Sequence, residues 1–582
     1  MKLAICISIL FIFLPFTAHA NGLSIANPGL GLQDTTNHTI VVQFDINWLN
    51  AWRDSDAAIT AATGNYDAAW VFIKYSTDGG TTWNHATLKA AGGTATSSGN
   101  GLINPTGFSG GTATVAGASK NLDIVVPTEA TSGKKGAFVQ ITSGQGSTVS
   151  GTLNSTGVQF LWDTGTDVGT SGANDITAAA AIIDVMAIEM VYIPQGSFYV
   201  GTPTTNVNGL TGYFFGGGTT LPFQITSEGL ITIANSAGNL YYANVGGNVG
   251  DGAGNLPTNV GGGGFPKGYG AFYIMKYEVS QGQYRDFLNT LTRAQQTNRV
   301  ATSIGAGTTT VTNVFVMSNT TTPSNRNGIR VISPIPAAGP VTFGCDLGNT
   351  GTLNGASGGE WIAANFVSWV DLMAYGAWAG LRPLTELEFE KAGRGVNAVV
   401  DGEYAWGSNA TPTQATSISA GGTNAEVAGQ TGNGLMVYGS AGSVQGPMRV
   451  GMGATGSTTR VQSGASYYGV MELSGNVWER AVTVGNATGR AFIGSHGTGV
   501  LSVSGTASSN GNAINTDWPG YTVTNWNGAG TGEVTGATGS GYRGGAWGYA
   551  SAFEAVADRS YAALTDATRS SAGGGRLART SP

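Results

Sequence analysis

The sequence predicts an α+β protein in which an all-β sandwich over residues 21–186 is followed by a second, larger domain over residues 187–582. Two observations lead to this prediction. Short runs of β-branched and aromatic residues fill the first region, whereas helical periodicity with capping residues begins only after Met190. Long stretches of Gly, Thr, Ser and Asn then interrupt the second region, which is typical of a scaffold with insertions.

The amino terminus has the order of a secretory signal peptide. Lys2 precedes an apolar run over residues 3–17, and Ala18-His19-Ala20 offers small residues at the two positions that a signal peptidase reads. The apolar run is shorter than the ~20 residues that a spanning helix needs. We therefore expect cleavage after Ala20 and a secreted or cell-surface protein that does not span the membrane.

The first region contains five runs with the composition of strands, and no helical period. Thr77-Asp78-Gly79-Gly80 is a strong turn signal after the second run. Several short strands separated by Gly turns favour a sandwich. The runs cover residues 39–46, 69–76, 123–126, 137–141 and 158–162.

Three helices are expected in the second region, each from a residue pair at its start with capping-box spacing. Gly380 is the expected end of the second helix. On the third helix we place Glu386, Glu388 and Glu390 on different sides, so no paired carboxylate site of the glycosidase type is expected. The starting pairs are Ser280 and Gln283, Ser368 and Asp371, and Thr385 and Glu388.

Gly-rich stretches separate these helices and are expected to be insertions that decorate a fixed scaffold. Five tryptophans of the second region are expected to fill its core, since each is a large apolar body that needs a partner for its indole N–H. The stretches cover residues 203–268, 300–358, 408–465 and 483–540. The tryptophans are Trp369, Trp378, Trp406, Trp478 and Trp547.

Composition narrows the classes of function. Charged residues are 10% of the chain, where roughly 25% is usual, and Gly accounts for 94 of 582 residues. Lys and Arg are scattered and the formal net charge is -7, so we expect no nucleic-acid partner. Loss of the signal peptide removes Cys6 and leaves Cys345 alone, which excludes an intramolecular disulfide and a dithiol site.

The order of the motifs in the second region resembles the formylglycine-generating-enzyme family, also called the sulfatase-modifying factor family. This resemblance implies a compact α+β fold related to C-type lectins. Residues 66–75 also resemble a front β-domain of some secreted bacterial members. The matching segments are residues 190–201, 272–280, 365–378, 381–390, 404–407, 471–479 and 543–547.

The resemblance also implies where catalytic groups would stand. The family's enzyme binds copper through two cysteines, and counting from Trp547 places those positions at Tyr549 and Glu554. Neither side chain replaces a soft thiolate for copper(I), so no copper and no catalytic residue are expected. An iron-dependent branch needs a histidine cluster, and only His496 lies in this region. A protein-modifying oxidase with a rewired active site remains the alternative function.

Family members carry calcium near the segment that matches residues 472–479. By this resemblance Gly475 and Val477 would offer backbone carbonyls, Glu479 a carboxylate, and Glu472 would stand in place of an Asn ligand. Hard oxygen ligands at alternate positions suit a structural calcium ion. The alternative is that Glu479 only caps or pairs locally.

Three C-terminal runs, residues 548–553, 560–563 and 570–573, carry the ligand-binding hypothesis. Related bacterial members, and the variable proteins of diversity-generating retroelements, have Asn runs at these places. Every residue in the three runs can be reached from an Asn codon by changing only adenines. Drift in a chain rich in Ala, Ser and Gly is the alternative.

We predict that Tyr549, Phe553 and Tyr561 lie together on an exposed face and bind a ligand, because small residues interleaved with aromatics make adaptable binding loops. The residues between and beside the runs should be buried or hydrogen-bonded scaffold, namely Arg543, Trp547, Arg559, Arg569 and Arg576. The sequence thus favours a ligand-binding or structural module with an unknown extracellular ligand or protein partner.

Overall fold

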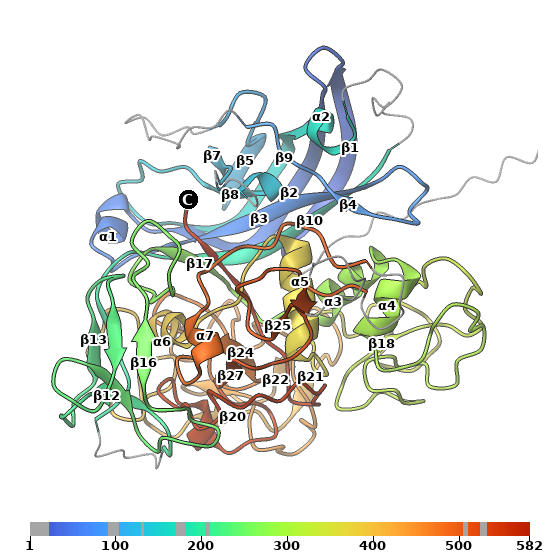
Figure 1. The fold of residues 1–582 in the computed structure, drawn as a ribbon. Coiled ribbons are helices and arrows are strands. Elements are labelled where there is room, and N and C mark those ends of the chain that lie inside the picture. Colours follow the sequence, from blue (N-terminus) through green and yellow to red (C-terminus); the bar gives the residue numbers. More distant parts are fainter. Residues whose placement is uncertain are drawn as a thin grey trace, which may run out of the picture.

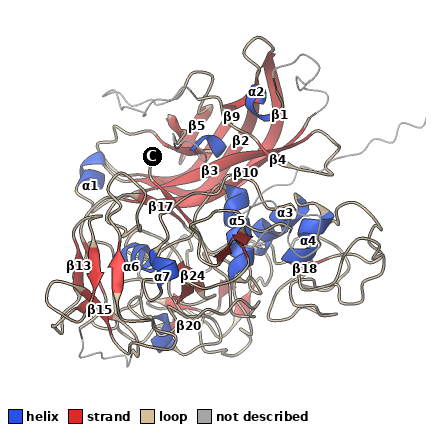
Figure 2. Cartoon of the chain, viewed as in Figure 1, coloured by secondary structure: helices blue, strands red, loops and turns tan. Residues whose placement is uncertain are grey.

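The computed structural model describes residues 22–90, 104–127, 129, 133–169, 181–203, 210–503, 510–523 and 532–582. The expected signal peptide, residues 1–20, lies outside the described residues. Strands outnumber helices, and the helices are short, which is compatible with the predicted α+β class (Figure 2). The strands up to residue 193 lie in the upper part of Figure 1, and most of the remaining chain lies in the lower part, although the C-terminus returns to the upper sheet.

A twelve-stranded sheet runs through both parts of the chain, with the main order β28-β17-β10-β3-β2-β9-β5-β6. The remaining strands, β1, β4, β7 and β8, pair with members of this path. The expected runs at 39–46, 69–76, 137–141 and 158–162 lie in β2, β3, β8 and β9, and 123–126 overlaps β7. The bounds are β1 Ser24–Asp34, β2 Thr39–Arg53, β3 Tyr66–Ser76, β4 Asn84–His85, β5 Thr112–Val115, β6 Ala118–Lys120, β7 Leu122–Val125, β8 Ala137–Ile141, β9 Val149–Asp163, β10 Ile182–Ile193, β17 Phe272–Met275 and β28 Ala578–Thr580.

Strand β10 joins the two regions. It pairs with β3 from Ile182–Ser76 to Tyr192–Tyr66, and its last residues pair with β17. The expected boundary between residues 186 and 187 therefore falls inside a strand.

Two cores lie on opposite faces of β3 and β10. Ala69, Val71 and Ile73 of β3 face a core shared with β2, β8 and β9, whereas Trp70 and Phe72 face the core of the second region. Because both faces are covered, β3 is buried along its whole length and its sequence is almost continuously apolar.

The three expected helices are present, and each begins with a capping box at the expected residues. Gly380 ends the second helix in a left-handed conformation with φ 71°, as expected for a C-cap glycine. A further helix, α4, starts with a capping box between Thr292 and Gln295 that the sequence analysis did not identify. The helices with α labels are α1 Asp56–Thr60, α2 Thr164–Asp167, α3 Gln281–Asn289, α4 Arg293–Arg299, α5 Trp369–Ala379, α6 Glu386–Arg394 and α7 Ala487–Arg490, and the 3-10 turns are Gly133–Lys135 and Ser551–Glu554.

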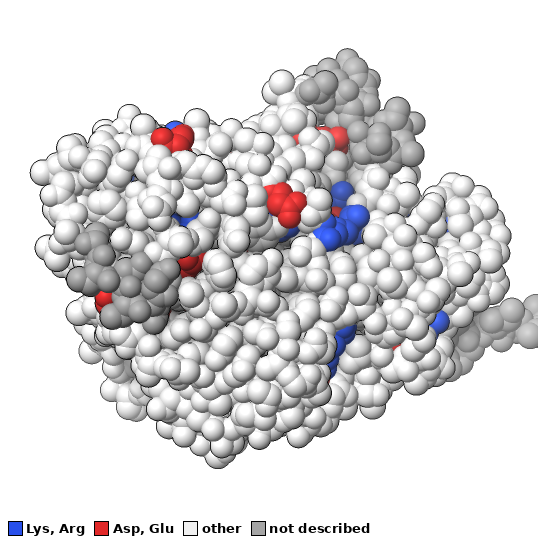
Figure 3. Space-filling view, turned by 90° about the horizontal axis from the view of Figure 1, so that it is seen from below, with Lys and Arg blue, Asp and Glu red and all other residues white. Residues whose placement is uncertain are grey.

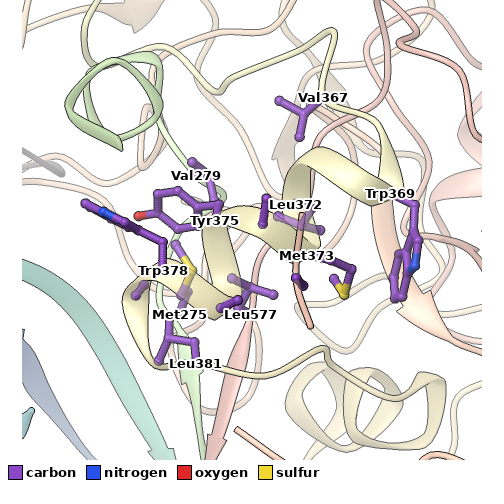
Figure 4. Packing of buried hydrophobic residues seen from close by; sticks show 14 of the residues in the cluster. Met275, Val279, Val367, Trp369, Leu372, Met373, Tyr375, Trp378, Leu381 and Leu577 are labelled. Carbon is purple, nitrogen blue, oxygen red and sulfur yellow. The ribbon is translucent and has the colours of Figure 1, made fainter. Parts of the chain in front are cut away.

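Helix α5 lies at the centre of the larger core. Trp369, Leu372 and Trp378 are buried on this helix and pack with Met275 of β17 and with Leu577 (Figure 4). The indole of Trp369 donates to the carbonyl of Pro519 at 2.8 Å, and that of Trp378 to Oγ1 of Thr290 at 2.8 Å. All five expected core tryptophans are buried.

The Gly-rich stretches contain short strands in small sheets of two to four strands. Among the described residues, no helix is long and apolar enough to cross a membrane. Figure 3 shows one face on which charged side chains are few and scattered. The remaining strands are β11 Phe198–Val200, β12 Phe214–Gly216, β13 Phe223–Ile225, β14 Ile231–Ile233, β15 Leu240–Tyr242, β16 Gly254–Leu256, β18 Ile329–Arg330, β19 Gly344–Cys345, β20 Thr413–Gln414, β21 Ile418–Ser419, β22 Val427–Ala428, β23 Leu435–Met436, β24 Glu479–Val482, β25 Tyr521–Thr522, β26 Glu533–Val534 and β27 Ser540–Arg543.

Candidate ligand-binding site

Buried arginines fix the segment that carries the three C-terminal runs. Arg543 at the end of β27 contacts Glu386 at 2.9 Å and Glu390 at 2.7 Å. Arg559 contacts Glu386 at 3.0 Å, and Arg576 contacts Glu479 at 2.6 Å. These three guanidinium groups are buried, so the segment is held from inside by ion pairs.

The expected scaffold residues are in their expected environment. Arg543, Trp547, Arg559 and Arg576 are buried, and the half-buried Arg569 pairs with Asp371 at 2.7 Å. This part of the prediction is confirmed.

The expected arrangement of glutamates on α6 is wrong. Glu386 and Glu390 are four residues apart on one helix face and contact the same guanidinium, that of Arg543. Glu388 pairs instead with Arg382 at 2.6 Å. Burial alone would raise the pKa of Glu386, but Arg559 and Arg543 bring it below its ordinary value. These carboxylates therefore serve as counter-ions for buried arginines.

Aromatic side chains from the first two runs gather around Trp478. Ring centroids of Tyr549, Phe553 and Tyr561 lie 5.0, 6.3 and 5.7 Å from that of Trp478. Phe553 also packs against Tyr549 at 6.0 Å and Tyr561 at 5.6 Å. The three predicted residues thus lie together, although they are half-buried where the sequence predicted an exposed face.

A cavity of about 120 Å³ opens beside this aromatic group, and we call it the Trp478 cavity. It takes one residue from each of the three runs, namely Tyr549, Tyr561 and Ser570. Phe553 packs behind the wall and does not line it. The other lining residues are Trp478, Tyr542, Leu564 and Asp566.

The sequence analysis did not identify four of these lining residues as part of a site. It placed Trp478 in the core, where its side chain does lie, but one side of the indole also forms a cavity wall. Tyr542, Leu564 and Asp566 carry no local signal. They join the site only because β24 pairs with β27 and the chain after Tyr561 returns to it.

The two positions expected for catalytic cysteines lie in different surroundings. Tyr549 lines the Trp478 cavity, whereas Glu554 is buried outside that lining. Oε1 of Glu554 accepts from the backbone N of Ala546 at 3.0 Å, and burial raises the pKa of this carboxyl well above its ordinary value. Cys345 is buried in β19, and burial raises the pKa of its thiol to about 12.

The segment expected to hold calcium presents oxygen atoms without protein partners. Oε2 of Glu472 and Oε2 of Glu479 are buried, and neither has a hydrogen-bond partner. No hydrogen bond among the described residues ends on the carbonyl of Gly475 or of Val477. Oε1 of Glu472 accepts from the backbone N of Gly451 at 2.9 Å.

A third buried carboxylate, Glu278, belongs to this cluster and was missed from sequence. It accepts from the backbone N of Val477 at 2.9 Å and from Asn476 Nδ2 at 2.5 Å. Burial and then the charge of Glu479 raise its pKa well above its ordinary value. In the part of the chain that the structure describes, no three His, Cys, Asp or Glu side chains could hold a metal ion by themselves. A cation here would need the backbone carbonyls as well, which is a donor set that suits calcium.

Two larger cavities lie elsewhere. One of about 400 Å³ lies between the first region and the second and is lined by Trp52, Lys276 and Tyr467 among others. The other, of about 770 Å³, includes Arg382 and His496 in its lining. Nϵ2 of His496 accepts from the backbone N of Thr580 at 3.0 Å, so that nitrogen is already engaged.

Residues 267–580 match the family described as the sulfatase-modifying factor enzyme 1-like domain. No curated protein matches the chain.

Proposed function

The chain belongs to the sulfatase-modifying factor enzyme 1-like family, whose domain covers more than half of its length, and from this we propose that it is a non-catalytic member that binds a ligand in the Trp478 cavity. The observation that carries the proposal is that one small cavity takes a residue from each of the three C-terminal runs. Segments of similar composition thus meet at one place on a scaffold held by buried arginines.

The chemistry of the second region supports binding over catalysis. A two-cysteine copper site needs two accessible thiolates. Cys345 is buried with a raised pKa, and Tyr549 and Glu554 stand at the positions that the family resemblance assigns to the cysteines. Glu554 accepts a hydrogen bond from the backbone N of Ala546, and its carboxylate fills the space that a side chain at Gly545 would need. Its role is therefore structural.

Further features complete the proposal. The signal-like amino terminus supports export to the cell exterior.

We also propose that the strands before residue 186 are arranged as a sandwich. The proposal is supported by the core that β2 and β9 share with β3 and β8, although β2 pairs with β3 only at Arg53–Tyr66. Calcium, if bound by Glu472, Glu479 and the carbonyls beside them, acts structurally.

The three runs are proposed to be the variable positions of a diversity-generating retroelement. Most of their residues are half-buried or exposed, so replacing them would leave the scaffold intact. Only Ala562, Ala572 and Gly573 are buried within the runs.

A thermal-shift screen tests the binding role. Monosaccharides, amines, carboxylic acids and short peptides are screened against the wild-type protein and against Tyr549→Ala. Ligands of the cavity raise the melting temperature of the wild type by mass action and lose this effect in the variant. Tyr241→Ala is the matched control, because Tyr241 is also half-buried among aromatic rings but does not line the cavity. Stabilisation that survives in Tyr549→Ala, or no stabilisation by any class, would overturn the proposal.

A further inference from the structure

The walls of the Trp478 cavity have the arrangement of an aromatic box. Tyr542, Tyr549 and Tyr561 have ring centroids 5.7, 5.0 and 5.7 Å from that of Trp478. Their planes are inclined to the indole by 60°, 74° and 82°. The tyrosines therefore stand steeply on the indole ring and line one cavity with it.

A carboxylate completes the lining. Asp566 accepts from the backbone N and the hydroxyl of Thr568 at 2.8 and 2.7 Å, and from the hydroxyl of Tyr542 at 3.3 Å. Burial alone would raise the pKa of Asp566, but the hydrogen bonds from Thr568 and the charge of Arg480 bring it below its ordinary value. The cavity thus carries a fixed negative charge at neutral pH.

The nearest arginine, Arg480, forms no ion pair with Asp566, although its charge lowers the pKa of that carboxyl. Arg480 is buried, and its guanidinium donates to the carbonyl oxygens of Asp566 and Thr568 at 2.8 and 3.1 Å. It also lies 4.4 Å from the ring centroid of Tyr542, but it does not line the cavity. Among the described residues no ion pair ends on the carboxylate of Asp566.

We propose that the Trp478 cavity binds a methylated ammonium group, such as the head group of choline, with Asp566 as its counter-ion. The inference rests on the proposed binding function and names its ligand class. Aromatic faces attract a cation, and a methylated cation needs no hydrogen-bond acceptors from the walls. Four aromatic rings surround the space, and its polar atoms are the tyrosine and Ser570 hydroxyls, the indole N–H of Trp478 and the carboxylate of Asp566.

The size of the cavity favours a single head group. Its volume of about 120 Å³ is well below the ~300–1,000 Å³ of ordinary small-molecule pockets. A whole sugar ring or peptide segment would have to lie outside it. A primary ammonium group has three donors, and any donor that does not reach Asp566 or a hydroxyl would face aromatic carbon.

Isothermal titration calorimetry on the full chain tests the inference with tetramethylammonium, choline, ammonium and 3,3-dimethylbutan-1-ol, which is the neutral isostere of choline. We expect both methylated cations to bind with one-to-one stoichiometry and at least about tenfold more tightly than the alcohol. Equal affinity for the alcohol, or tighter binding of unmethylated ammonium, would overturn the inference.

Variants separate charge from fold. Asp566→Asn should weaken choline binding about tenfold and leave the alcohol unchanged, since the amide keeps the acceptor oxygen but loses the charge. Asp78→Asn is the control. Asp78 accepts from the backbone N and the hydroxyl of Thr82, as Asp566 does from Thr568, but it lies in a turn that does not line the cavity. An Asp566→Asn protein that binds choline as tightly as the control would contradict the role of the carboxylate.

Two further arms identify the source of the head group and separate the two proposals. If the protein sediments with phosphatidylcholine vesicles and free choline prevents this, the head group belongs to a lipid. If the protein binds choline but does not sediment with the vesicles, the ligand is a free solute. If tetramethylammonium fails while other ligands still bind in a Tyr549-dependent way, the ligand class is wrong and the binding function stands. If nothing binds in that way, both fail.

Discussion

Arg559 and Glu386 form an ion pair with 3.0 Å between Nη2 and Oε1, and their side chains are 0% and 1% exposed. The pair joins the first turn of α6 to the chain immediately before the second C-terminal run. The same carboxylate also receives Arg543, the hydroxyl of Thr483 and the backbone N of Val484. The loops around the Trp478 cavity therefore rest on a charged network inside the protein.

Replacing Glu386 with Ala should strongly destabilise the fold. The substitution leaves the buried Arg559 without its counter-ion and Arg543 with Glu390 alone, which costs about 3–5 kcal/mol of unfolding free energy. Urea denaturation measures the change. Lys89→Ala is the control: Lys89 pairs with Asp163 at 3.0 Å but is 47% exposed, so its loss should cost less than ~1 kcal/mol. Similar small effects of both variants would contradict the role of the network.

Glu554→Gln should stabilise the protein near neutral pH. Burial raises the folded-state pKa of Glu554 well above 4.5, so folding opposes its ionisation. Below pH 4.5 the carboxyl is protonated in both states and the variant should gain nothing. As the pH rises above 4.5 the unfolded state loses the proton first, which lowers wild-type stability relative to Gln. Melting temperatures between pH 4 and pH 8 check this sign, and a gain that is largest in acid would refute it.

Calcium should stabilise the protein if the oxygens around residues 472–479 bind it. Chelation should then lower the melting temperature, and Glu472→Gln should remove that response. Glu472 is the better position to change, because Glu479→Ala would also leave the buried Arg576 unpaired. Identical melting with calcium and with chelator, in a wild-type protein first freed of metal, would restrict Glu479 to local pairing.

The purified protein should not generate formylglycine. With copper(I), oxygen and a Cys-Xaa-Pro-Xaa-Arg peptide, mass spectrometry should show an unchanged peptide, because Cys345 is buried and no other cysteine follows the expected signal peptide. Conversion of the peptide cysteine would refute the non-catalytic assignment and revive the alternative of a rewired oxidase.

Tolerance to substitution should differ within the C-terminal runs. Ala550 is exposed, so Ala550→Tyr should change the unfolding free energy by no more than about 0.5 kcal/mol. Ala562 is buried against Gly541, and Ala562→Tyr should cost about 1–3 kcal/mol or more by overpacking. Denaturation of both variants decides the matter. Equal tolerance at both positions would show that burial does not limit variation in the runs.

The sequence predicted those features that depend on neighbours along the chain. Capping pairs placed α3, α5 and α6, and Gly380 marked the end of α5, because each signal lies within a few residues of the element it controls. The apolar run in β3 predicted a strand for the same reason. Thr292 and Gln295 at the start of α4 have the same capping-box spacing, so this helix also carries a local signal.

Features that depend on distant contacts could not be predicted in the same way. Asp566 enters the Trp478 cavity through pairing of β24 with β27 and the return of the chain after Tyr561. Glu278 joins the oxygen-rich segment through contacts with residues almost two hundred positions away. The motif order placed Tyr549 and Tyr561 near each other only through a family resemblance, and their half-buried state follows from packing on Trp478.

The pairing of β10 with strands of both regions limits how recombination could separate the two regions. Its first residues complete the sheet of the front region, its last residues hold β17, and its two faces seal different cores. A gene fusion or recombination event with its break near residue 186 would strip either partner of a central strand and expose its sheet edge to aggregation. The two regions should therefore be retained together in evolution, with sequence changes concentrated in the loops that carry the three C-terminal runs. They should also unfold in one cooperative transition.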